Sequence, residues 1–140
     1  YGIGFRDDYE KLALNLVEGN GFRYLPGTAE STLREPGYPY ALAGMFAIFG
    51  YEIVAAQLLN VVLMLGAALL SIHLVRCVTP DRWTAAAAAV LFYAYPAGLI
   101  MQLRGGFEPL FAFVLALFAF LAARALQSGR KLDFALAGLG

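Results

Sequence analysis

The chain has 140 residues, of which 61% are hydrophobic and 14% charged, and its mean hydropathy is +0.67. Soluble domains are about 45–50% apolar and about 25% charged, so the composition excludes an ordinary soluble domain and predicts a membrane protein. The formal net charge is zero and no basic block occurs, which argues against nucleic-acid binding. The single cysteine, Cys77, cannot form an internal disulfide.

An amphipathic helix is predicted near the N-terminus, because apolar residues recur at helical spacing from Tyr9 to Val17. Asp7 and Glu10 have the spacing of a capping box at its start, with Asp in place of Ser or Thr. Gly19 would end this helix. Residues 20–37 follow as a loop rich in Gly, Pro, Thr and Ser, and irregular loops of such length are more often functional than idle.

A second, apolar helix is predicted from Tyr40 to Phe49, after a rigid turn formed by Pro36 and Pro39. Its length would cover only about half of the hydrocarbon core of a bilayer, which fits a juxtamembrane or half-inserted helix. We therefore expect residues 1–52 to form an extracytoplasmic loop with juxtamembrane helices.

Apolar runs long enough to cross a bilayer occupy most of residues 53–140. The expected fold class is all-α, a polytopic membrane helix bundle. Because the chain begins at Tyr rather than Met and stops inside an apolar run, we expect a fragment truncated at both ends. The expected transmembrane helices cover about residues 53–75, 83–101 and 107–123, with the start of a fourth from 134.

Basic residues in the short loops predict the orientation of these spans. Segments 76–82 and 124–133 carry five Lys and Arg residues, whereas the loop between the second and third spans carries only Arg104. The two richer segments should therefore lie in the cytoplasm. This orientation puts residues 1–40 and Glu108 on the extracytoplasmic side.

Several short motifs, in order along the chain, resemble GT-C glycosyltransferases. The similarity is to the branch related to dolichyl-phosphate-mannose protein mannosyltransferases and bacterial lipid A aminoarabinose transferases, and it covers the N-terminal part of such an enzyme. In that family the acidic residue of the first loop commonly lies about four positions before the aromatic residue of the helix, whereas Asp7 and Asp8 directly precede Tyr9. The motifs are Asp7-Asp8-Tyr9, Glu18-Gly19-Asn20-Gly21-Phe22, Arg34-Glu35-Pro36-Gly37-Tyr38-Pro39, Phe49-Gly50 and Glu108-Pro109-Leu110.

The resemblance implies a membrane enzyme, inactive as this fragment alone, that moves a sugar from a polyprenyl-phosphate donor to a lipid, glycan or protein acceptor with inversion. It implies a GT-C bundle with juxtamembrane helices in its first extracytoplasmic loop, in a bacterial inner (plasma) membrane. A sugar–phosphate bond is already activated, so no organic cofactor is expected, while a divalent cation held by carboxylates stays possible. The implied base is Asp7 or Asp8, and the implied substrate-binding residues are Arg34, Glu35, Tyr38, Arg104 and Glu108.

These residue types suit that chemistry. A carboxylate can take the proton from the acceptor hydroxyl, and Arg34 and Arg104 could bind the departing phosphate through two hydrogen bonds each. Glu35 and Glu108 would then orient acceptor, sugar or metal.

Each residue type also has a structural interpretation. Asp7 could simply cap the helix, Asp8 could complement its dipole, and Tyr38 could anchor the chain at the membrane surface. Glu108 could be paired at the edge of its span.

Two other classes of protein fit the composition. A polytopic transporter would use Pro-interrupted spans and Glu108 as a translocation path, but it predicts polar residues at mid-span depth. The middles of 53–75 and 107–123 are nearly free of charge. A non-catalytic membrane scaffold would need neither the Asp pair nor the Arg34-Glu35 motif.

Overall fold

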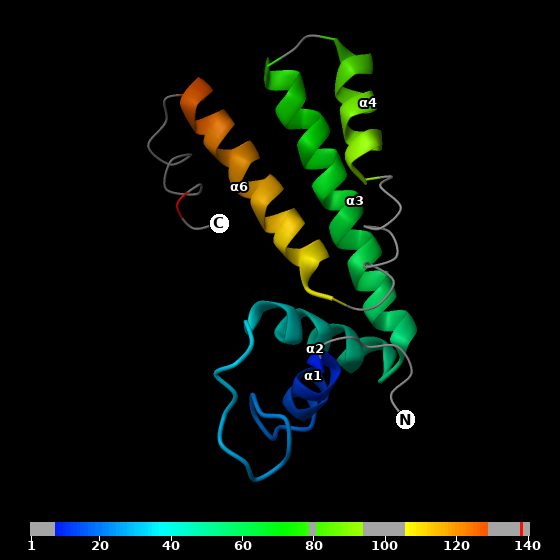
Figure 1. The fold of residues 1–140 in the computed structure, drawn as a ribbon, viewed down its shortest axis with the longest axis vertical. Helices are drawn as coiled ribbons and strands as arrows, with labels where there is room; N and C mark the ends of the chain where they lie inside the picture. Colours follow the sequence, from blue (N-terminus) through cyan, green and yellow to red (C-terminus); the bar gives the residue numbers. More distant parts are fainter. Residues whose placement is uncertain (1–7, 79–80, 94–105, 129–137, 139–140) are drawn as a thin grey trace. The chain divides into compact units, whose positions relative to one another are not determined.

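The structure is a computed structural model, which describes residues 8–78, 81–93, 106–128 and 138. Within these ranges the chain is helical and contains no β-strand, so the predicted all-α class is confirmed for the described part. The helices are α1 (Tyr9–Val17), α2 (Gly37–Phe49), α3 (Ile53–Val78), α4 (Arg82–Tyr93) and α6 (Glu108–Ser128) (Figure 1).

The chain divides into two compact units. The first unit comprises Tyr1–Val62 with Ile100–Leu110, and the second unit comprises Leu63–Leu99 with Phe111–Gly140. The boundaries fall inside the two longest helices, so α3 and α6 each contribute residues to both units.

Helix α1 spans the predicted Tyr9–Val17, but its N-cap differs from the prediction. Its N-cap is Asp8, which has a left-handed backbone (φ 57°) and forms no side-chain hydrogen bond to the helix. The carboxylate of Asp8 instead contacts Lys11 Nζ at 2.7 Å. Glu10 lies inside the helix and is buried. The predicted cap at Asp7 is therefore wrong, because Asp8 takes the cap position, and Asp7 itself lies outside the described residues.

The loop between α1 and α2 is fastened to α1 by a buried asparagine. Asn15 Nδ2 donates a hydrogen bond to the backbone oxygen of Arg23 at 2.8 Å. Further along, the Ser31 amide donates to the Phe22 carbonyl at 2.8 Å, which folds the loop back on itself. The ring of Phe22 then stacks on Tyr40 of α2, with centroids 6.0 Å apart and planes only 4° from parallel. These contacts explain how a long irregular loop holds one conformation.

Helix α2 begins at Gly37, earlier than the predicted Tyr40. Pro39 therefore lies in the first turn of the helix, where its missing N–H costs no intrahelical bond. The predicted rigid turn is part of the helix for this reason. The helix stops at Gly50, whose φ of 83° suits glycine.

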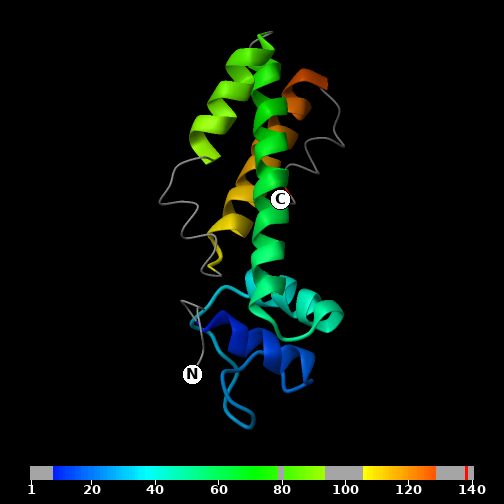
Figure 2. The same cartoon turned by 90° about the vertical axis from the view of Figure 1, so that its right-hand side faces the viewer.

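Helices α1 and α2 pack against each other and form the core of the first unit (Figures 1 and 2). Their apolar stripes meet as the i, i+3, i+4 spacing requires. The buried residues of this core are Tyr9, Leu12, Ala13, Tyr38, Leu42, Phe46, Ala55 and Ala56.

In the part of the chain that the structure describes, two helices are long and apolar enough to cross a membrane, over Ile53–Cys77 and Glu108–Gln127. Only 22% and 17% of their most apolar stretches is buried, whereas a core helix of a soluble protein would be mostly buried. Such extensive apolar exposure is unfavourable in water, and it supports a membrane protein. Helix α3 begins at the predicted Ile53 and runs beyond the predicted end at Val75.

Helix α4 begins beside the predicted start of the second span. Asp81 caps it, accepting hydrogen bonds from the backbone N–H groups of Trp83 and Thr84, each at 3.1 Å. Helix α4 thus has side-chain N-cap hydrogen bonds, whereas α1 has none. Residues 94–101 of the predicted second span, and the predicted fourth span from 134 except residue 138, lie outside the described residues.

Small residues make the close contacts of the second unit. Ala67, Ala85 and Ala125 are completely buried. A Cβ atom on Gly66 of α3 would lie 2.7 Å from Phe113 Cε2 of α6, so only glycine permits this approach without movement of the ring. Helices that pack within lipid commonly meet through such small residues.

Candidate functional site

Tyr9, the first residue of α1, connects the two charged residues that precede α2. Its hydroxyl donates a hydrogen bond to Glu35 Oε2 at 3.1 Å. Arg34 Cζ lies 5.3 Å from the centroid of the same ring, within the range of a cation–π contact. Tyr9 itself is only 1% exposed. A positive and a negative group from the loop are thus held against one buried aromatic side chain.

Tyr38 supports Tyr9 from α2. The two rings meet edge to face, with centroids 5.4 Å apart and planes at 78°. The Tyr38 hydroxyl donates to Asn60 Oδ1 on α3 at 3.1 Å, and both residues are buried. Phe107 adds a second edge contact to Tyr9 at 6.1 Å. Elements far apart in the sequence therefore converge on Tyr9 within the first unit.

The protonation states of this cluster follow from its surroundings. Burial, followed by the hydrogen bond and charge of Glu35, raises the pKa of Tyr9 to about 12, with Arg34 acting in the opposite direction. Burial, with a smaller effect of the Glu108 charge, raises the pKa of Tyr38 to about 12. Both phenols are therefore neutral hydrogen-bond donors at ordinary pH.

Glu35 keeps its negative charge. Its own backbone amide and then the Tyr9 hydroxyl hold the pKa of its carboxyl below the usual value. The cluster thus presents a carboxylate beside a guanidinium. Such a pair can bind hydroxyl and phosphate groups, but neither member suits proton abstraction as well as a free carboxylate would.

The two candidate bases are not both described. Asp7 lies outside the described residues. Asp8 is exposed and contacts Lys11, and this contact raises the pKa of the Lys11 ammonium. The structure does not join Asp8 to Arg34 or Glu35 by any described contact, although Asp8 directly precedes Tyr9 in the chain.

Glu108 lies at the start of α6, as the sequence analysis expected, and it is exposed. Its carboxylate rests against Gly106, so closely that a Cβ atom on Gly106 would overlap it. Its charge also acts on Tyr38, which links this residue to the cluster electrostatically. Arg104, the expected second phosphate ligand, lies outside the described residues.

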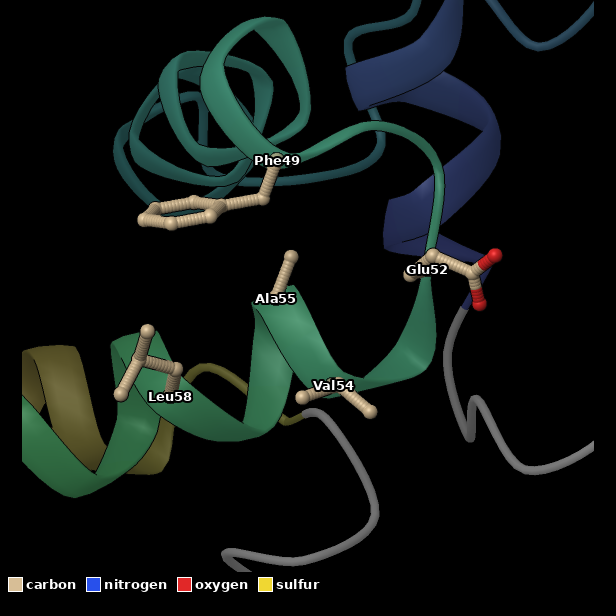
Figure 3. Close-up of a pocket in the computed structure, with 5 residues that line it drawn as sticks. All are labelled: Phe49, Glu52, Val54, Ala55 and Leu58. Atoms are coloured by element: carbon tan, nitrogen blue, oxygen red, sulfur yellow. The ribbon is translucent and has the colours of Figure 1, made fainter.

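An open pocket of about 310 Å³ lies elsewhere in the first unit, where α2 meets α3. Figure 3 shows the ring of Phe49 over Ala55 and Leu58, with the carboxylate of Glu52 turned away from that ring. Among the described residues, the lining is apolar except for Glu52 and includes no basic side chain. These lining residues are unsuited to a phosphate group, and none of the predicted site residues that the structure describes is among them.

The described residues contain no group of three or more His, Cys, Asp or Glu side chains that could hold a metal ion. Searches of protein-family models, curated proteins and solved structures gave no match to this chain.

The sequence points to Arg34, Glu35 and Tyr38 as site residues, whereas Tyr9 stands out only in the apolar helix stripe and in the Asp7-Asp8-Tyr9 motif, without a role in the site. The signal for a further role was the residue type, because a buried tyrosine hydroxyl needs a hydrogen-bond partner that phenylalanine would not. Asn60 of α3 accepts the hydrogen bond from Tyr38 within the first unit.

Proposed function

We propose that this protein is a membrane glycosyltransferase of the GT-C type, which transfers a sugar from a polyprenyl phosphate to an acceptor on the extracytoplasmic side of a bacterial inner membrane. Several motifs in the order typical of that family support this proposal. The observation that carries it is the Arg34–Glu35 pair, which is fixed on buried Tyr9 at the start of α2. The two apolar helices α3 and α6 supply the membrane context that a lipid-linked donor requires.

The reaction needs a base and a cationic group from the protein. The acceptor hydroxyl must lose its proton, for which the proposed base is the carboxylate of Asp7 or Asp8. The hydroxyl oxygen then forms a bond to the anomeric carbon while the bond from that carbon to the phosphate oxygen breaks. The polyprenyl phosphate leaves with the bonding electrons, and a guanidinium lowers the energy of that developing charge.

Arg34 is the described residue best suited to receive the phosphate. A guanidinium can donate two parallel hydrogen bonds to phosphate oxygens, which an ammonium cannot. Glu35, held ionised beside it, can accept hydrogen bonds from sugar hydroxyls. Tyr38, Arg104 and Glu108 are the other proposed binding residues, and the site would take no organic cofactor.

Binding of undecaprenyl phosphate to the purified intact protein tests the proposal without knowledge of the sugar. We expect undecaprenyl phosphate to bind, and GDP and UDP to compete only weakly with it for the site. Arg34→Ala should weaken this binding roughly 10- to 100-fold, as loss of a hydrogen bond to a charged group implies, and Arg34→Lys should recover only part of it. Arg23→Ala is the matched control, because Arg23 lies in the same loop and bonds Thr28 and Glu30 instead. Tighter binding of the nucleotides would refute the donor assignment, and equal binding by Arg34→Ala would remove Arg34 from the site.

A further inference from the structure

Tyr9 uses two different parts of one side chain on two neighbouring residues of the loop. Its hydroxyl bonds the carboxylate of Glu35 at 3.1 Å, and its ring faces the guanidinium of Arg34 at 5.3 Å. The ring is fixed on its other sides by edge contacts with Tyr38 and Phe107. An immobile side chain therefore contacts both members of a charged pair that extends from an irregular loop.

Packing alone does not account for this arrangement. A phenylalanine at position 9 would keep the ring, its edge contacts and most of the interaction with Arg34. It would lose the hydroxyl, which bonds the exposed side chain of Glu35 and also interacts with Arg34. The hydroxyl of Tyr9 therefore serves to hold the side chains of Glu35 and Arg34 and is not needed to fill the core.

We propose that Tyr9 is a positioning residue, which fixes Arg34 and Glu35 relative to each other so that a guanidinium and a carboxylate face the phosphate and the sugar of one donor molecule. This inference rests on the proposed function for the identity of the ligand. That Tyr9 holds Arg34 and Glu35 in place does not depend on which ligand they bind. Long Arg and Glu side chains lose conformational entropy when they bind a ligand, and prior fixation lowers that cost.

Trypsin cleavage measures the fixation independently of any activity. The bond after Arg34 is a trypsin site within the turn held by Tyr9, and the bond after Arg23 is a reference site in the same loop. In the intact protein, Tyr9→Phe should raise the rate of cleavage after Arg34 about three- to tenfold relative to cleavage after Arg23, as loss of one hydrogen bond implies.

Two further variants separate positioning from packing. Tyr38→Phe removes a buried hydroxyl from the same aromatic cluster, but that hydroxyl bonds Asn60, so the cleavage ratio should stay at the wild-type value. In a Glu35→Ala background, Tyr9→Phe should have a smaller effect than in the wild type, because the Glu35 partner of the hydroxyl is already gone. An unchanged ratio in Tyr9→Phe, or an equal rise in Tyr38→Phe, would overturn the proposal.

Undecaprenyl phosphate binding then connects the fixation to the ligand. Tyr9→Phe should weaken binding about three- to tenfold, less than Arg34→Ala, since Arg34 is still present but less well held. Normal binding by Tyr9→Phe together with faster cleavage after Arg34 would refute the role of Tyr9 toward the donor. If the wild-type protein binds no undecaprenyl phosphate, the proposed function fails, whereas the cleavage ratios still decide whether Tyr9 fixes the pair.

Discussion

The two units of this chain bury side chains of different size. In the first unit the largest buried residues are Tyr9 and Tyr38, followed by Leu12, Leu42 and Asn60, and both tyrosine hydroxyls are hydrogen-bonded. In the second unit the buried hydrophobic residues described are alanines. Its large apolar side chains are exposed instead, including Leu65, Leu69, Phe111, Leu115 and Phe118.

The difference shows which solvent each segment is built for. In water the hydrophobic effect drives large apolar side chains into the interior. In lipid this driving force is absent, so large apolar side chains stay on the surface and helices contact each other through small residues. The first unit also exposes large apolar residues, at the end of α2 and along α3, for example Ile48 and Val54. Within the described chain, the core between α1 and α2 is thus the part that buries its large side chains as a water-soluble protein does, and the candidate site lies there.

The largest expected effect comes from removing the acidic groups at the start of the first unit. The double change of Asp7→Asn with Asp8→Asn should lower kcat by roughly 10² or more if either carboxylate is the base. The fold should survive, because asparagine tolerates the left-handed conformation of position 8 and Asp8 makes no side-chain cap bond.

Sugar transfer by the intact protein, at saturating donor, is the measurement. Lys11→Gln is the matched control, since it breaks the contact with Asp8 and leaves both carboxylates in place. Near wild-type kcat in the double variant would eliminate the proposed base. The two single variants would show which carboxylate acts.

A second prediction concerns alkaline pH and the buried hydroxyl of Tyr38. Burial raises its pKa from 10.0 to about 12, so the folded protein holds the proton more tightly than the unfolded chain does. Its contribution to stability is therefore complete below pH 10 and is lost as pH rises toward 12. The pKa shift corresponds to about 2–3 kcal/mol.

Thermal unfolding in detergent at pH 9 and pH 11.5 tests this prediction. Tyr38→Phe should lose less stability between the two pH values than the wild type, because the other alkaline groups remain in both proteins. An identical loss in wild type and variant would show that Tyr38 does not titrate in a buried site.

The smallest expected effects are changes in stability caused by glycine substitutions, which allow a direct comparison of the two units. Gly66→Ala, in the second unit, would bring a Cβ atom within 2.7 Å of the Phe113 ring. We expect a net loss of about 1–2 kcal/mol, because overpacking outweighs the gain in helix propensity. Gly44→Ala, in the first unit, meets nothing within 4 Å and should stabilise α2 by about 0.5–1 kcal/mol.

Unfolding in the same detergent measures both variants. Phe113→Leu in the Gly66→Ala background should restore part of the loss, since a smaller side chain makes room. A stabilising Gly66→Ala would mean that the close approach of α3 and α6 is not required.

Local sequence determined much of the helical structure. The structure contains the helix predicted from the apolar stripe between Tyr9 and Val17, and it contains helices α3 and α6 where long apolar runs predicted them. Helix α2 ends at the predicted Phe49, before Gly50. These signals are local, because periodicity and length depend on neighbours along the chain. Helix starts were less predictable: Pro39 allowed α2 to begin early, and Asp8 rather than Asp7 took the cap of α1.

The partners of the site residues depended on tertiary structure. Arg34 and Glu35 are visible in the sequence as a charged pair before a proline, and the resemblance proposed them for the site. Nothing in the sequence indicates that Tyr9 lies beneath both, since residues 9 and 35 are joined only by the folding of a long loop onto α1. The sequence therefore determined which residues could carry the chemistry, whereas only the packing of α1 on α2 decided which of them lie together.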